Sequence, residues 1–447
     1  MTIPVVGIGA SAGGLEALKL LLAHLPADTG LAFVFVQHLD PKRHSNLTEI
    51  LTRISPVPVE QAADGHPIEP NHLYVIPPDV ELEIANQALR LTPRALASSG
   101  PHTPIDHFLR SLAQECGSRA IGVVLSGAGR DGAAGLETLK AAGGVRFAQD
   151  PATAKFDSMP RAAIDRGCVD FVLSPEAIAM KLAKLGQHPY ITEDENTLQP
   201  TPATKGWFES ILTLLSDATG VDFALYHENT VRRRISRRLA LRDIRSLEEY
   251  WEQLERDPGE LSALHRDLLI NVTSFFRDRE SFEDLKKLVL PRLVKHRSAV
   301  APIRVWAAGC ATGEEAYSIA ISLKEYLEET GCVYPVQIFA SDISATAVEK
   351  ARSGKYAENI ATDVGPERLR RHFSKIDGGY QISKTLREMC VFSRHDLMHD
   401  PPFSKLDLII CQNVLISFGS ARKQVVERFH YALKPGGFLV LGRSETE

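Results

Sequence analysis

The stretch VVGIGASAGG, residues 5–14, joins a short apolar run to a turn of small residues, and a helical pattern follows at 15–24. The first part of the chain repeats this alternation. Further strand-like runs lie at 32–37, 72–76, 120–125, 145–148 and 169–173, and helix-like segments lie at 105–115 and 134–142. Such alternation is typical of a parallel, doubly wound sheet. Residues 1–186 are therefore expected to form an α/β domain, with a small edge hairpin over the alternating segment 82–91.

A second α/β alternation fills the last third of the chain. Its strand-like runs lie at 303–307, 336–341, 408–411 and 438–441. Helical patterns precede it from residue 206 to 290, and a polar, proline-containing segment, 187–205, lies before them. Asp377-Gly378-Gly379 predicts a hairpin turn within 357–391, where the alternation is interrupted.

The sequence thus predicts an α/β protein with two doubly wound, Rossmann-like domains. The second is expected to follow an all-α subdomain and to carry a small antiparallel β insertion at about 357–391. The expected divisions are a first domain 1–186, a linker 187–205, a helical subdomain 206–290 and a second α/β domain 291–447.

Composition and charge disfavour several classes of protein. The 447 residues carry a formal net charge of −5, which does not favour binding to nucleic acid or to an anionic membrane. No run reaches the roughly 18 apolar residues of a membrane span, and the N-terminal residues lack the pattern of a signal peptide. The six cysteines are scattered without a C-x-x-C pair, so neither a disulfide framework nor a metal site is indicated. A cytoplasmic location is expected.

Gly9-x-Ser11-x-Gly13 presents a serine on the turn between a strand and a helix. Such a turn exposes the hydroxyl above the end of a sheet, and the helix N-terminus behind it offers N–H groups to an oxyanion. A nucleophilic serine also needs a base and an orienting carboxylate. His38 follows the second strand-like run, and Asp131 follows the run that ends at 125. Because parallel strands end at one edge of a sheet, Ser11, His38 and Asp131 are predicted to converge.

The same loop also fits a dinucleotide-binding pattern. G-x-G-x-x-A at 7–12 matches the relaxed fingerprint, which expects an acidic residue at the end of the next strand. That strand instead ends in Gln-His at 37–38, and Asp40 comes slightly late. Taken alone, the loop favours neither function, and only its combination with His38 and Asp131 favours a hydrolase.

A glycine-rich loop, Gly-Cys-Ala-Thr-Gly at 309–313, lies between a strand-like run and a helix in the second half. Asp342 follows the next strand, where an acid can bind ribose hydroxyls. Asn413 follows the third run, and Lys-Pro-Gly-Gly at 434–437 precedes the last. Together these features are typical of Rossmann-like methyltransferases that use S-adenosylmethionine.

A dehydrogenase is the alternative for this half. However, Ala311 stands where the NAD fingerprint has its second glycine. The acidic pair Glu314-Glu315 would repel a pyrophosphate but would suit the cationic methionine end of the methyl donor.

The first half resembles the catalytic domain of CheB, the chemoreceptor protein-glutamate methylesterase, whose relatives also deamidate receptor glutamines. The similar residues lie within about 1–185, at 7–17, 37–38, 126–135 and 159–161. The resemblance implies that Ser11, His38 and Asp131 form a catalytic triad. Ala12 and Ala128 depart from the residues usual in the family near the nucleophile and the oxyanion hole. A backbone N–H survives both changes, so activity with an altered rate is expected.

The second half is similar to CheR, the chemoreceptor glutamate O-methyltransferase, over about 206–447. The similar residues lie at 271–277, 308–318, 341–343, 411–414 and 442–445. The resemblance implies a cofactor site for S-adenosylmethionine lined by Asn271, Thr273, Arg277, Glu314 or Glu315, Asp342, Asp396, Leu397, Asn413 and Val414. Arg277 is the candidate for holding the substrate carboxylate. Departures from the family pattern are Gln412, Ser417 and Asp396.

A helical segment at 231–242 carries six arginines beside an apolar stripe. It fits either a solvated surface or, as the resemblance implies, an electrostatic dock for acidic receptor helices. The expected protein is a CheB–CheR fusion that acts on the cytoplasmic helices of a chemoreceptor-like protein, with other two-component proteins as further partners. A signalling scaffold in which one or both catalytic sites are inactive is the alternative. No receiver domain precedes Ser11, so control by phosphorylation through one is not expected.

Overall fold

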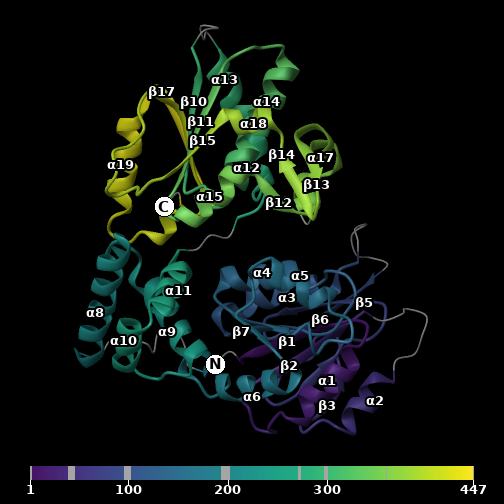
Figure 1. The fold of residues 1–447 in the computed structure, drawn as a ribbon. Coiled ribbons are helices and arrows are strands. Elements are labelled where there is room, and N and C mark those ends of the chain that lie inside the picture. The colour runs from purple at the N-terminus through teal and green to yellow at the C-terminus, as the bar shows by residue number, and fades with distance from the viewer. Residues whose placement is uncertain are drawn as a thin grey trace. The chain divides into compact units, whose positions relative to one another are not determined.

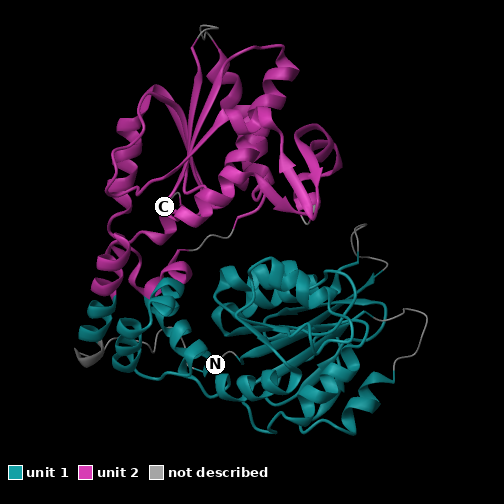
Figure 2. Cartoon of the chain, in the orientation of Figure 1, with its two compact units in different colours: residues 1–211, 232–264 teal, residues 212–231, 265–447 magenta. Residues whose placement is uncertain are grey.

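The computed structural model describes residues 3–38, 46–94, 102–192, 202–269, 273–295, 301–358 and 360–445 (Figure 1). They fall into two compact units, one of residues 1–211 with 232–264 and one of residues 212–231 with 265–447 (Figure 2). Within the described ranges, no helix is both long and apolar enough to cross a membrane.

The first unit contains a seven-stranded sheet in the order β3-β4-β2-β1-β7-β8-β9. All neighbouring strands pair in parallel, which confirms the predicted doubly wound sheet. The strands are β1 (Val5–Ala10), β2 (Ala32–Gln37), β3 (Val59–Gln61), β4 (Leu73–Val75), β7 (Ala120–Val124), β8 (Val145–Gln149) and β9 (Phe171–Leu173). β5 (Val80–Ala85) and β6 (Ala88–Pro93) form the predicted antiparallel hairpin.

Helices cover both faces of this sheet (Figure 1). One face packs on α1 and α6, and the other packs on α3 and α4. The helices of this part are α1 (Gly14–Ala23), α2 (Leu47–Thr52), α3 (Pro104–Cys116), α4 (Ala133–Ala142), α5 (Ser158–Asp165), α6 (Pro175–Leu185) and α7 (Pro189–Thr192).

The glycines of β1 explain why α3 packs so closely on that strand. A Cβ at Gly9 would lie 2.2 Å from Cγ2 of Ile105, and one at Gly7 would lie 2.9 Å from side chains of α3. These glycines therefore make room for a helix, and this packing accounts for the G-x-G spacing without a dinucleotide.

Part of the expected linker is packed structure. Tyr190 and Ile191 of α7 are buried, and the Tyr190 hydroxyl donates to the carbonyl of Gly143 at 2.7 Å. The first helix of the helical region begins at Pro202. Residues 193–201, between these two helices, lie outside the described residues.

The helical region agrees with its predicted periodicity. Its elements are α8 (Pro202–Thr219), a 3₁₀ turn (Phe223–Leu225), α9 (Glu228–Arg242), α10 (Leu247–Arg256), α11 (Pro258–Leu268), α12 (Arg279–Asp284), a π-helical turn (Leu285–Val289) and α13 (Leu290–Val294). Most of α9 belongs to the first compact unit, because Ala240 and Leu241 are buried in the core beside α1 and α6.

A buried ion cluster joins α9 to β8 within the first unit. Asp170 accepts from Nη2 of Arg146 at 2.6 Å and from Nη2 of Arg237 at 2.5 Å. Only 3% of Arg146 and 1% of Arg237 is exposed. Burial alone would raise the pKa of Asp170, but the two guanidinium groups outweigh it and lower the pKa to about 2.

The second unit contains a five-stranded sheet in the order β15-β11-β10-β16-β17, again with parallel pairs. The strands are β10 (Ile303–Ala308), β11 (Val336–Asp342), β15 (Cys390–Arg394), β16 (Leu406–Cys411) and β17 (Leu433–Leu441). α14 (Glu314–Thr330) and α18 (Lys384–Met389) pack on one face, and α19 (Arg422–Ala432) packs on the other (Figure 1). α15 (Ala345–Ser353) follows β11.

The predicted antiparallel insertion is confirmed, with different limits. It consists of β12 (Lys355–Ala357), α16 (Ile360–Val364), α17 (Pro366–His372), β13 (Phe373–Ile376) and β14 (Gly379–Ile382). The chain reverses at Gly378, whose φ is 72°. Residues 390–391, which were expected in the insertion, instead begin β15 of the main sheet.

Candidate functional sites

Ser11 and His38 follow the ends of adjacent parallel strands. Ala10 of β1 pairs with Gln37 of β2, so each predicted residue comes one position after a paired strand end. The N–H of Ser11 donates to the Ser126 carbonyl at 3.1 Å, and its carbonyl accepts from Gly14 at 3.0 Å. These backbone bonds fix the serine at the start of α1, above the carboxyl edge of the sheet.

Asp131 is held beside His38. Its Oδ2 lies 3.0 Å from Nε2 of His38 and also accepts the N–H of Ile105 at 2.9 Å. The other oxygen accepts from Asp106 at 2.8 Å and from Gly132 at 2.9 Å. The buried carboxylate therefore caps the start of α3 while it orients the imidazole.

The loop after β7 packs against the serine turn. Ser126 donates its hydroxyl to the Ala12 carbonyl at 3.0 Å, and a Cβ at Gly127 would lie 3.0 Å from Cβ of Ser11. Among the described residues, the N–H groups of Gly127 and Gly129 have acceptors, whereas that of Ala128, an exposed residue, has none. A free N–H of this kind is what an oxyanion requires.

The structure thus brings the three predicted residues to one edge of the sheet. The His38–Asp131 contact is formed, while no hydrogen bond from the Ser11 hydroxyl to His38 is present among the described residues. Such bonds often shorten only when a substrate binds. A second histidine, His102, lies 6.2 Å from His38 between ring centres. The sequence pattern gave no signal for His102, because it lies outside the three motifs.

The glycine-rich loop after β10 is shaped by three positive φ angles, 76° at Gly309, 44° at Ala311 and 96° at Gly313. Asp342, at the end of β11, accepts the N–H of Ala311 at 2.9 Å through Oδ2 and that of Ser344 at 2.9 Å through Oδ1. Burial raises the pKa of Asp342, and these N–H groups oppose the rise. An ionised carboxylate has about four acceptor positions, so Asp342 retains capacity for a ligand hydroxyl.

The two glutamates that begin α14 differ in their surroundings. Oε2 of Glu314 accepts the hydroxyl of Thr312 at 2.6 Å. Oε1 of Glu315 is buried and has no hydrogen-bond partner among the described residues. Burial, and then the charge of Glu445, raise the pKa of Glu315 to about 8, while Arg277 opposes the rise.

The predicted segment 271–277 is described from Thr273 onward, and Asn271 lies outside the described residues. Phe275 and Phe276 are buried, and the N–H of Phe276 donates to the Ser318 hydroxyl at 3.1 Å. The φ of Phe276 is 50°, a strained value for an aromatic residue. Arg277 follows at the surface and lines a cavity of about 550 Å³ with Ser274, Asp278, Arg279, Glu280, Asp363 and Arg443.

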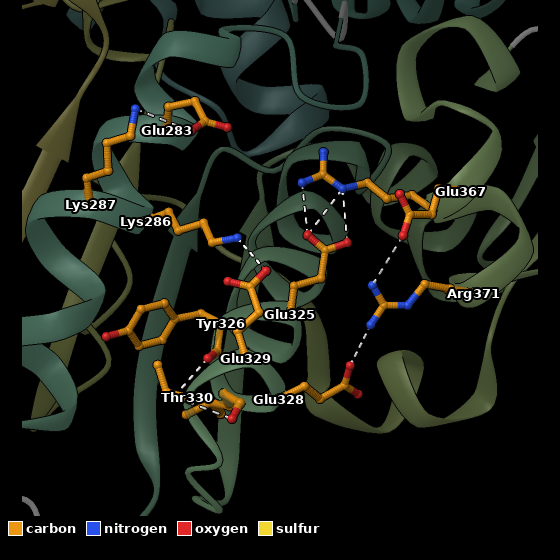
Figure 3. A network of polar contacts seen from close by, with 12 residues as sticks. Glu283, Lys286, Lys287, Glu325, Tyr326, Glu328, Glu329, Thr330, Glu367 and Arg371 are labelled. Carbon is orange, nitrogen blue, oxygen red and sulfur yellow. Dashed lines mark hydrogen bonds and ion pairs between the residues drawn. The ribbon is translucent and has the colours of Figure 1, made fainter.

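A polar network on α14 holds the neighbouring α17 (Figure 3). Arg368 donates to both oxygens of Glu325, at 3.1 Å and 2.9 Å, and its guanidinium lies 4.1 Å from the ring centre of Phe276. Arg371 contacts Glu328 at 2.7 Å. Burial would raise the pKa of Glu325, but hydrogen bonds from His372 and Arg368 lower it to about 2. The network therefore supports the loop that carries Arg277.

The remaining predicted residues lie beyond β15 and β16. Both oxygens of Asp396 are engaged in a local turn, with the N–H of Met398 at 2.8 Å and with His399 at 2.9 Å. Leu397 is buried. Asn413 and Val414 follow β16, and their N–H groups donate to Glu445. Glu445 lies in the motif at 442–445 but was not predicted to be a site residue.

The arginine-rich helix is more engaged than either interpretation of its sequence suggests. Arg237 binds Asp170, and Arg238 donates to Glu260 at 2.8 Å. Arg242 also donates to Glu260, at 2.6 Å. Arg234 and Arg237 are buried. Internal carboxylates thus neutralise part of the basic face, which neither a solvated surface nor a receptor dock would require.

Comparisons with known proteins match both halves. The model of the CheB methylesterase family matches residues 6–182. The models of the CheR methyltransferases match residues 207–269 with their all-alpha domain and residues 271–446 with their SAM binding domain. A chemotaxis protein methyltransferase of Borreliella burgdorferi is 32% identical over 252 residues, which cover 54% of this chain and 89% of that protein.

The chain belongs to the chemotaxis protein methyltransferase family.

This family member is a fusion of a CheB methylesterase domain with the CheR methyltransferase domains, and S-adenosylmethionine is the cofactor of the second. Chemotaxis protein methyltransferase 2 of Pseudomonas aeruginosa is 35% identical over 251 residues, 54% of this chain and 87% of that protein. An uncharacterized 104.1 kDa protein of Rhodobacter capsulatus is 39% identical over 421 residues. These residues are 90% of this chain but only 44% of that relative.

Among solved structures, the CheB methylesterase catalytic domain of Thermotoga maritima is 30% identical to this CheB–CheR fusion. The match covers 41% of this chain and 100% of that domain, with a TM-score of 0.39.

Proposed function

We propose that the chain methylates glutamate side chains on the cytoplasmic helices of a chemoreceptor-like protein and hydrolyses the resulting methyl esters. Residues 206–447 carry out the methyl transfer, and residues 1–186 carry out the ester hydrolysis. The observation that carries the hydrolytic half is the 3.0 Å contact between His38 and Asp131. His38 directly follows β2, and β2 pairs with β1, the strand that Ser11 follows. The family matches support both halves.

For hydrolysis, we propose Ser11 as the nucleophile. His38 Nε2 faces Asp131, so Nδ1 is the nitrogen that takes the proton of the Ser11 hydroxyl as its oxygen bonds to the ester carbon. The proton then goes to the departing methoxide, which leaves as methanol. Water, activated by the same imidazole, cleaves the acyl-enzyme and restores glutamate. The N–H of Ala128 is the proposed oxyanion donor. The same steps on a glutamine amide would release ammonia.

For methyl transfer, S-adenosylmethionine supplies an electrophilic methyl group on a sulfonium. The orphaned, buried Oε1 of Glu315 fits the ammonium of its methionine end, whereas Glu314 already accepts from Thr312. Asp342 retains acceptor capacity for ribose hydroxyls. Arg277, at the cavity beside Glu280, is the proposed partner of the substrate carboxylate. Thr273, Asp396, Leu397, Asn413, Val414 and Asn271 complete the proposed site. Catalysis here is mainly positioning.

One receptor preparation tests the two activities together. Incorporation of labelled methyl groups measures transfer, and release of methanol from the methylated receptor measures hydrolysis. We expect the parent chain to do both. A chain that does neither would instead be a scaffold.

Replacing Asp342 with alanine should weaken binding of S-adenosylmethionine by about 100-fold, since it removes charge-assisted bonds to Ala311 and Ser344 and the proposed ribose partner. Calorimetry on the full chain measures this change. Asp377→Ala, at an exposed position in the turn between β13 and β14, is the matched control and should bind like the parent. Equal affinities of the parent and Asp342→Ala would remove Asp342 from the site.

Binding of S-adenosylmethionine should also strengthen as the pH rises from about 6 to 7.5. Because the pKa of Glu315 is raised to about 8, its carboxyl is largely protonated in this range and must release a proton to hold an ammonium. The dissociation constant should then fall by up to about tenfold per pH unit. Calorimetry in buffers of different ionisation enthalpy measures the released proton. Glu315→Gln should bind more weakly and without this dependence, and an equal dependence in both proteins would contradict the assignment.

A further inference from the structure

The Glu445 carboxylate accepts four backbone N–H groups at the ends of two strands. Oε1 accepts from Val414 and Leu415, both at 2.7 Å. Oε2 accepts from Asn413 and Gly442, both at 2.9 Å. Asn413 to Leu415 follow β16, and Gly442 follows β17. Its exposure is 0%, so one buried carboxylate ties two adjacent strand ends together.

The turn that Glu445 holds is strained and forms part of the proposed methyl-donor site. The φ of Asn413 is 59°, a conformation that non-glycine residues adopt only when the surrounding structure imposes it. Val414 packs on the backbone of Gly309, where a Cβ would lie 2.3 Å from Cγ2 of Val414. The position of this turn therefore determines where Val414 packs against the glycine-rich loop.

Glu445 has no remaining capacity to bind a ligand itself. A carboxylate has about four acceptor positions, and the four N–H groups use them. Its backbone carbonyl is also held, because it accepts from the guanidinium of Arg422. Its influence on a ligand must therefore pass through the residues that it holds.

Glu445 also acts on Glu315 through its charge. Burial and Glu445 raise the pKa of Glu315, and Arg277 lowers it. The charge of Glu315 acts on the thiols of Cys310 and Cys411, and burial raises the pKa of both thiols well above the usual value. They are thus neutral near pH 7, which leaves Glu445 and Arg277 as the charges that act on Glu315.

We propose that Glu445 is a positioning residue of the methyl-donor site, which sets Asn413 and Val414 against the Gly309–Gly313 loop without touching the donor. This inference rests on the proposed binding of S-adenosylmethionine at this edge of the second sheet. It adds a residue from the last turn of the described chain to the determinants of donor affinity.

Glu445→Gln tests the inference, because it keeps the shape of the side chain but turns one acceptor oxygen into a donor that faces N–H groups. Calorimetry on the full chain should show a dissociation constant for S-adenosylmethionine raised about 10- to 100-fold. The pH dependence of binding should move to lower pH, since the charge that raises the pKa of Glu315 is gone. A purely structural role would not move this profile. Methyl-ester hydrolysis should stay at the parent rate.

Glu427→Gln, at an exposed position on α19, is the matched control and should bind like the parent. Glu445→Asp keeps the charge but cannot reach all four donors, so it should lose affinity without the change in pH dependence. If the parent does not bind the donor, the proposed function fails. If the parent binds and Glu445→Gln binds equally well with the same pH profile, the positioning role fails.

Hydrogen exchange on the parent chain covers the case in which the variants do not fold. Without the donor, the amides of Asn413, Val414, Leu415 and Gly442 should exchange slowly, because each is bonded to the buried carboxylate. Fast exchange at these four amides would overturn the inference.

Discussion

Replacing Ser11 with alanine should abolish the hydrolysis of receptor methyl esters, with turnover falling by about 10⁴-fold or more. The change removes the hydroxyl of the proposed nucleophile, so no acyl-enzyme can form. It should leave the fold intact, because the bonds that hold Ser11 in place use its backbone N–H and carbonyl. Methanol release from a methylated receptor measures the effect.

Two comparisons make this result specific. Methyl incorporation by Ser11→Ala should match the parent, since the proposed transferase residues lie in the second compact unit. Ser55→Ala, whose hydroxyl bonds to the backbone of Val57 two residues away, should retain full hydrolysis. Equal methanol release from Ser11→Ala and the parent would refute the triad.

Replacing Asp170 with alanine should lower the free energy of unfolding of the first unit by about 3–5 kcal/mol. Arg146 and Arg237 would then keep their charges in a buried site without the carboxylate that neutralises them. The fall of the Asp170 pKa to about 2, from about 3.9, corresponds to roughly 2–3 kcal/mol. This contribution is complete above about pH 4 and is lost as the pH falls through 2.

Urea unfolding of the full chain, followed by hydrogen exchange of peptides from β7 and β8, measures this loss. Asp157→Ala is the matched control, because Asp157 forms an exposed ion pair with Arg161 one helical turn away. Exposed pairs of this kind contribute little, so its unfolding curve should stay close to that of the parent. An unchanged curve for Asp170→Ala would mean that the buried cluster does not stabilise this unit.

Much of the fold could be predicted because strands that are buried on both faces leave continuous apolar runs. β2 has the predicted limits 32–37. β3 is only three residues long, and β15 alternates buried and exposed positions, so neither gave such a run. The convergence of Ser11, His38 and Asp131 was predictable in the same way, since residues after parallel strands share an edge.

The contacts that the sequence did not reveal depend on tertiary neighbours. Glu445 acts on residues about 30 positions earlier because β16 pairs with β17. Arg237 donates a hydrogen bond to Asp170, which lies 67 positions earlier in the sequence. A run of arginines shows where charge is placed but not which carboxylates face it, so the basic helix appeared more available for docking than its ion pairs allow.

The Arg146–Asp170–Arg237 cluster has an evolutionary consequence. The CheB family model ends at residue 182 and the CheR all-alpha model begins at 207, yet a charge on one side of this border is neutralised from the other. Loss of Asp170 would leave Arg237 buried without its carboxylate, whereas loss of Arg237 would leave Asp170 paired with Arg146 alone. A recombination at the border that brought in a first half without an acidic residue at position 170 would leave Arg237 buried without a counter-charge. The two regions should therefore be inherited together, although each has relatives of its own.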